Sequence, residues 1–67
     1  MITVVVNDVP RPTDDTETVA ELLSNLPVPP RGVAVAVNGE VVRRADWPQH
    51  RLVDGDRVEV LTAVQGG

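Results

Sequence analysis

The spacing of apolar residues changes twice along the chain, and this pattern constrains the possible folds more than any other feature of the sequence. Residues 2–7 follow the two-residue period of a strand with one strongly apolar face. Residues 19–26 then place apolar side chains three and four positions apart, as in an amphipathic helix. The two-residue period returns at 33–37 and 57–63, so one helix must pack against strands that precede and follow it.

The predicted helix has signals at both ends. Thr18 and Glu21 have the spacing of a capping box, in which each side chain bonds to the other residue's backbone N–H. Acidic residues just before it place negative charge near the positive end of the helix dipole: Asp14, Asp15 and Glu17. Pro27 ends the helix because proline has no N–H to donate.

Two hairpins are predicted on either side of this helix. Asn38-Gly39 is a strong short-range hairpin signal, since both residues tolerate the left-handed backbone of a tight turn. Asn7-Asp8 supplies turn chemistry before a return strand at 9–13. That strand contains two prolines, so we expect it at an edge of the sheet.

The element order predicts a single α+β domain over residues 1–67, with one main helix packed across a mixed sheet of four to five strands. This is the β-grasp, or ubiquitin-like, arrangement, in which the first and last strands are parallel neighbours joined through the helix. Residues 64–67 are expected to follow the domain as a flexible tail. The core predicted beneath the helix consists of Ile2, Val4, Val6, Val33, Val35, Val37, Val58 and Val60.

Composition excludes several classes of function. The chain has no cysteine, hence no disulfide, thiolate nucleophile or sulfur-rich zinc site. A net charge of −4 argues against nucleic-acid binding, which needs concentrated positive charge. No stretch is long and apolar enough for a membrane span, and no signal-peptide pattern is present, so we expect a soluble, cytoplasmic protein. All six basic residues are arginine, so no side-chain amine could capture an activated carboxyl group.

The chain also lacks the residue constellations of an enzyme. His50 is the single histidine, with no thiol, lysine or tyrosine to share a site, and we interpret it as a solvent-facing loop residue. Asp54 and Asp56 flank a glycine in a predicted turn, which favours a structural role over acid–base catalysis. Trp47 is the single aromatic residue and is expected to pack beneath the long loop. We therefore expect no catalytic residue, no metal and no bound cofactor.

The sheet face away from the helix is a candidate docking patch. It should be flat and partly apolar, beside the point where the tail begins, and such exposed patches often mark interaction sites. The alternative is an ordinary neutral sheet surface. The residues expected to form the patch are Val5, Ala34, Ala36, Leu61 and Ala63.

The last four residues are Val64, Gln65, Gly66 and Gly67. One interpretation is a frayed end. The other is that two residues without a Cβ allow the terminal carboxylate to thread into a narrow catalytic cleft of another protein. A carboxylate is a poor electrophile until it is activated, for example as an acyl-adenylate formed from ATP. Because the sequence lacks the residues of an active site, we interpret the domain as a carrier whose reactive group is the carboxyl group of Gly67.

The sequence from Ala36 to Gly67 resembles the ThiS family, the sulfur carrier proteins of thiamine biosynthesis. It shares the V-N-G-E turn, the tryptophan loop, the L-x-D-G-D-x-V-E run and the terminal A-V-Q-G-G. With the first strand and the T-V-A-E-L-L helix, the resemblance spans essentially the whole chain. One departure is Asn7-Asp8, where the family commonly has Asn-Gly.

The resemblance implies a carrier that catalyses nothing itself. The Gly67 carboxylate would be adenylated with ATP by an adenylyltransferase that resembles ubiquitin-activating enzymes. Sulfur from a donor such as a cysteine desulfurase would convert the adenylate to a thiocarboxylate, which thiazole synthase would use. Gly66 would supply clearance, and Gln65 and Val64 would belong to the threaded segment.

Two alternatives stay open. The small subunit of molybdopterin synthase has the same fold and thiocarboxylate chemistry, but is usually longer and richer in aromatic residues. A protein modifier or plain binding module would use its tail for an isopeptide bond or for no chemistry. The identity of the partner separates them, since a neighbouring thiazole synthase gene supports sulfur transfer and a ligase does not.

Overall fold

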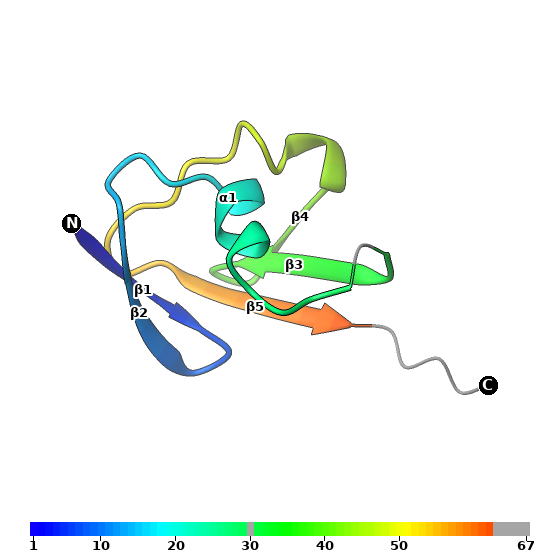
Figure 1. Cartoon of the computed structure of the whole chain (residues 1–67), viewed down its shortest axis with the longest axis horizontal. Helices are drawn as coiled ribbons and strands as arrows, with labels where there is room; N and C mark the ends of the chain where they lie inside the picture. The colour runs from blue at the N-terminus through cyan, green and yellow to red at the C-terminus, as the bar shows by residue number, and fades with distance from the viewer. Residues whose placement is uncertain (30, 63–67) are drawn as a thin grey trace.

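Two hairpins and a final strand form one five-stranded sheet in the computed structural model, which describes residues 1–29 and 31–62 (Figure 1). The first hairpin pairs β1 (Ile2–Val6) with β2 (Val9–Thr13), and the second pairs β3 (Val33–Val37) with β4 (Glu40–Val42). β5 (Arg57–Thr62) lies between the hairpins, parallel to β1 and antiparallel to β3. The strand order β2-β1-β5-β3-β4 confirms the β-grasp prediction, with the proline-containing β2 at an edge.

One helix, α1 (Val19–Ser24), lies across one face of the sheet (Figure 1). Its capping box is present: Thr18 Oγ1 accepts from the Glu21 backbone N–H at 3.2 Å, and Glu21 Oε1 accepts from the Thr18 backbone N–H at 3.0 Å. The helix ends earlier than Pro27 predicts, because the backbone N–H of Asn25 already turns back to the Leu22 carbonyl at 3.1 Å. Within the described residues no helix is long and apolar enough to cross a membrane.

The core lies between α1 and the sheet, as predicted. Six of the eight predicted sheet residues are buried: Val4, Val6, Val35, Val37, Val58 and Val60. Ile2 and Val33 are only partly buried, since a six-residue helix spans about 9 Å and leaves the ends of the strands uncovered. The side chains of Val42 and Leu52 also belong to the core, and the alternating pattern did not predict either.

The long connection from β4 to β5 is held against the start of α1 (Figure 1). The Val19 backbone N–H donates to the His50 carbonyl, and the Leu52 backbone N–H donates to the Glu17 carbonyl, each at 2.9 Å. His50 lies in this loop, as predicted, but it is half-buried rather than fully solvent-facing. Trp47 packs against the core as predicted, and its Nε1 donates to the Val42 carbonyl at 2.9 Å.

Candidate functional site

β5 runs through the centre of the sheet and ends at Thr62, immediately before the residues that the sequence marks as functional. The predicted sulfur-carrying residue, the predicted threading segment and one predicted docking residue lie outside the described residues: Gly67, Gly66, Gln65, Val64 and Ala63. What the structure describes is how the rest of the domain positions β5, the strand that precedes these residues in the sequence.

The first hairpin turn holds β5 near its end. Asn7 uses both atoms of its side-chain amide on the backbone of Val60: Nδ2 donates to the Val60 carbonyl at 3.1 Å, and the Val60 N–H donates to Oδ1 at 2.9 Å. The Asn7 backbone N–H also donates to the Val58 carbonyl at 2.9 Å. This amide continues the parallel pairing of β1 and β5 beyond the last residue of β1. Sequence reasoning assigned Asn7 to the turn and missed this second role.

The second hairpin turn holds β5 at its start. Asn38 Oδ1 accepts from the Arg57 backbone N–H, and Asn38 Nδ2 donates to Asp56 Oδ1, each at 2.9 Å. Asp56 is a buried charged residue, 6% exposed, and its Oδ2 accepts from the Val53 backbone N–H at 2.9 Å. Asp54 Oδ1 accepts from the Thr3 backbone N–H at 2.8 Å. Both carboxylates thus serve backbone structure, as their position around a turn predicted.

The open face of the sheet brings together part of the predicted docking patch. Ala34 lies opposite Leu61 in the β3–β5 pairing, and Ala36 lies opposite Val41 in the β3–β4 pairing. Leu61 is 66% exposed and Val41, which was not predicted, is 79% exposed. We call Ala34, Ala36, Val41 and Leu61 the open-face patch. A shallow hollow of about 210 Å³ lies over it, with Glu59 at its border.

Val5 does not join this patch. It pairs with Arg57 on the other side of β5, while Ala36 pairs with Glu59. The exposed charged side chains of β5 therefore separate Val5 from the alanines of β3. Alternation placed Val5 on the correct face, since its neighbours are buried, but only the strand order shows that the apolar surface is interrupted.

Among the described residues the pKa values of the Met1 amino group and the Glu17 carboxyl group are displaced, and neither group belongs to β5 or to the open-face patch. The hydrogen bond and charge of Asp15, 2.7 Å from the amino group of Met1, raise the pKa of that amine. Burial raises the pKa of the Glu17 carboxyl, and the negative charge of Glu21 raises it further. In the part of the chain that the structure describes, no three histidine or acidic side chains gather to hold a metal ion.

Comparisons with known proteins agree on one family. The family model described as the ThiS family matches residues 4–67. The sulfur carrier protein ThiS of Escherichia coli is 39% identical over 51 residues, which cover 76% of this chain and 77% of that protein. The sulfur carrier protein ThiS of Thermus thermophilus is 41% identical over 61 residues, covering 91% and 94%.

A solved structure is also similar over nearly its whole length. The crystal structure of the thiamine biosynthesis protein ThiS from Geobacter metallireducens matches with a TM-score of 0.81 and 38% sequence identity, covering 98% of this chain and 100% of that chain. Its likeness extends the sequence match to the three-dimensional fold. With a β-grasp fold, a last strand held by both hairpins and a family match that runs through Gly67, the chain belongs to the ThiS family.

Proposed function

We propose that the chain is a sulfur carrier in thiamine biosynthesis and that the Gly67 carboxylate is the group that carries the sulfur. The family match through residue 67, which includes the terminal Gly66-Gly67 pair, is the observation that supports this proposal most. The relatives named sulfur carrier protein ThiS support it further. The chain then serves as a co-substrate of partner enzymes and not as a catalyst.

The chemistry begins at the terminal carboxylate. An oxygen of Gly67 attacks the α-phosphorus of ATP on a partner enzyme, and pyrophosphate leaves. The resulting acyl-adenylate is then attacked at its carbonyl carbon by hydrosulfide, and AMP leaves with the bonding electrons. Where the donor is a protein persulfide, the attack gives an acyl persulfide, and a thiol must then cleave its S–S bond, forming a disulfide with the donor and releasing the thiocarboxylate. The product is a thiocarboxylate on Gly67. Cellular ATP supplies the activation, which fits the cytoplasmic setting expected from the sequence.

Three partners follow from this sequence of steps. An adenylyltransferase that resembles ubiquitin-activating enzymes forms the adenylate, a donor such as a cysteine desulfurase supplies sulfur, and thiazole synthase accepts it. Gly66 offers no Cβ to clash with a narrow active-site channel, and Val64 and Gln65 form the rest of the threaded segment. The open-face patch gives the first partner an apolar surface close to the end of β5.

The first test is carboxylate-dependent exchange of pyrophosphate into ATP. The full chain should support exchange by the adenylyltransferase, and a chain that lacks only Gly67 should not. Because the described fold ends before this residue, both chains should melt at the same temperature. Equal exchange rates for the two chains would contradict the assignment of Gly67. Attachment of the chain to lysines of other proteins would instead indicate a protein modifier.

A further inference from the structure

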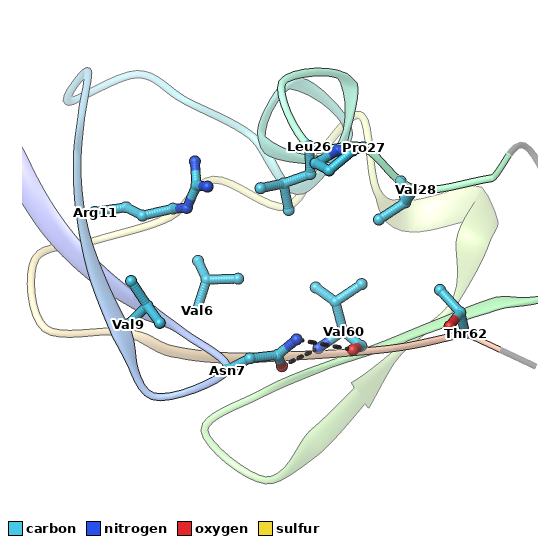
Figure 2. A pocket seen from close by; sticks show the side chains of 9 residues that line it. All are labelled: Val6, Asn7, Val9, Arg11, Leu26, Pro27, Val28, Val60 and Thr62. Atoms are coloured by element: carbon cyan, nitrogen blue, oxygen red, sulfur yellow. Dashed lines mark hydrogen bonds between the residues drawn. The ribbon is translucent and has the colours of Figure 1, made fainter.

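A cleft opens on the helix side of the sheet, beside the last residues of β5 (Figure 2). Its volume is about 320 Å³, which is at the lower end of the range for small-molecule sites. The segment after α1 lies above it, the first hairpin borders it, and β5 forms its floor (Figure 2). The lining residues are Val6, Asn7, Val9, Arg11, Leu26, Pro27, Val28, Val60 and Thr62.

The lining is mostly apolar, and the amide of Asn7 is committed to the backbone. The Asn7 side-chain amide is bonded on both atoms to the backbone of Val60 in the floor (Figure 2). The Val28 backbone N–H donates to the Leu26 carbonyl at 2.8 Å, which fixes the opposite wall. The cleft is therefore a preformed site for an apolar group and offers little for a polar cofactor to bind.

Arg11 is the exception in this lining. It projects from β2 beside the apolar wall (Figure 2) and is exposed. Among the described residues it takes part in neither of the two ion pairs, Met1 with Asp15 and Arg57 with Asp8. A guanidinium that pairs with no carboxylate of residues 1–29 or 31–62, next to an apolar cleft, is complementary to an acidic group that neighbours an apolar side chain.

The position of the cleft limits which protein can reach it. Thr62 lines the cleft and is followed by residues 63–67. A fully extended chain of this length spans at most about 17 Å. A protein that holds the Gly67 carboxylate in its catalytic centre therefore lies within that distance of the cleft.

We propose that the cleft receives an apolar side chain from an acidic segment of the adenylating partner, with Arg11 paired to a carboxylate of that segment. The inference rests on the proposed function, because it takes the partner from the chemistry at Gly67. The partner then contacts both faces of β5, with the open-face patch on one side and the cleft on the other. An apolar anchor in a pocket is the kind of contact that dominates affinity in protein interfaces, whereas a charged pair at the rim contributes mainly to the rate and the salt dependence of association.

Pyrophosphate exchange measured against carrier concentration tests this proposal. Val9→Glu and Arg11→Glu change exposed positions of an edge strand, Val9 being 56% exposed, so the fold should be retained. Each should raise the carrier concentration for half-maximal exchange about tenfold while exchange at saturation is kept. Arg51→Glu is the control matched to Arg11→Glu, because Arg51 is exposed and does not line the cleft, and the two substitutions change the net charge by the same amount. Val9→Ser serves as a second variant if Val9→Glu melts early.

The salt dependence of exchange tests whether Arg11 pairs with a carboxylate of the partner. Added salt screens an ion pair, so the half-saturating concentration of the unaltered chain should rise more steeply with salt than that of Arg11→Gln. If the half-saturating concentrations of the two chains rose equally with salt, the proposed pairing of Arg11 with an acidic segment would be wrong.

The cleft contact and the function at Gly67 can fail separately in this experiment. Half-saturating concentrations within twofold of the unaltered value for both cleft variants would overturn the cleft proposal and leave the function at Gly67 standing. An equal rise for Arg51→Glu would also overturn it, since the effect would then be one of general charge. No exchange with the unaltered chain would overturn the proposed function and the cleft proposal with it.

Discussion

The two hairpin turns have the same left-handed backbone but different residues. The β3–β4 turn uses Asn38 at φ 52° and Gly39 at φ 85°, and the β1–β2 turn uses Asn7 at φ 49° and Asp8 at φ 69°. Glycine adopts positive φ without a steric penalty, whereas a residue with a Cβ bears a strain of about 1 kcal/mol there. The shared asparagine and the differing second residue suggest two separate requirements.

The asparagine of each turn is required by β5. Asn38 bonds to the start of that strand and to the buried carboxylate of Asp56, and Asn7 bonds to Val60 near its end. The second residue of each turn only has to accept the backbone conformation. The hairpin turns therefore do more than reverse the chain, because their asparagines fix both ends of the strand that leads to Gly67.

The largest expected effect is at the buried end of β5. Asn38→Ala removes the donor to Asp56 Oδ1 and the acceptor of the Arg57 N–H, and leaves a buried charge with fewer partners. The free energy of unfolding should fall by about 3 kcal/mol in urea titration. The coupling between Asn38→Ala and Asp56→Ala in a double-mutant cycle gives the share of this loss that belongs to the pair. A loss below about 1 kcal/mol would show that the network contributes little.

Asn7→Ala should cost less, about 1.5 kcal/mol, because its two bonds are made to the neutral backbone groups of Val60 and their loss leaves no buried charged side chain short of a partner. Hydrogen exchange of the Val60 amide should accelerate in the variant, since that N–H loses its acceptor. Asn7→Asp is the matched variant: it keeps the acceptor for the Val60 N–H and loses the donor to the Val60 carbonyl. If the Val60 amide exchanges as slowly in Asn7→Ala as in the unaltered chain, the strand end is held by something other than this side chain.

Asp8→Gly should stabilise the chain by about 0.5–1 kcal/mol, because it removes the strain at positive φ and makes the first turn like the second. The ion pair between Asp8 and Arg57 is lost as well, but both side chains are exposed and such pairs contribute little. Asp8→Ala is the control, because it removes the same ion pair and keeps the strained backbone. Thermal melts should rank Asp8→Gly above Asp8→Ala, and the reverse order would refute the strain argument.

The smallest effect concerns how the first hairpin meets the helix. Glu17 accepts from Thr13 Oγ1 at the end of β2, and burial raises the pKa of its carboxyl. A raised carboxyl pKa means that ionisation opposes folding, so this penalty is present above the folded pKa and disappears as the pH falls below the unfolded value. Glu17→Gln should therefore increase stability at pH 7 relative to the unaltered chain and lose that advantage near pH 4. The gain should stay below about 0.5 kcal/mol because the side chain is half-exposed.

Much of the fold could be predicted because it rests on local periodicity. Strands at two-residue spacing, the Thr18 cap and the Asn38-Gly39 turn are all readable over a few residues, and the order of these elements along the chain predicts the β-grasp arrangement. Leu52 was missed because the Leu52-Val53 pair is too short to show a period, so the sequence does not tell which of the two is buried. Leu52 is 1% exposed because its backbone N–H bonds to the Glu17 carbonyl, which brings the loop over the core.

The surroundings of β5 were less predictable, because they depend on contacts between distant residues. The bond from Asn7 to Val60 joins positions 53 residues apart, and turn preference alone already explains an asparagine at Asn7. Val5 is separated from the open-face patch by the charged side chains of β5, and this separation depends on β5 lying between β1 and β3. The cleft beside Arg11 likewise needs three separate segments of chain to be in place.

The central claim is that sulfur replaces one oxygen of the Gly67 carboxyl group. The direct measurement is the mass of the intact chain and of its C-terminal fragment after incubation with the adenylyltransferase, ATP and sulfide. The fragment is needed because oxidation of Met1 or Trp47 changes the intact mass by nearly the same amount. The account predicts an oxygen-to-sulfur exchange confined to the C-terminal fragment, and its loss in Gly66→Val, which should fold normally. A mass change that persists after deletion of Gly67, or that lies in another fragment, would contradict it.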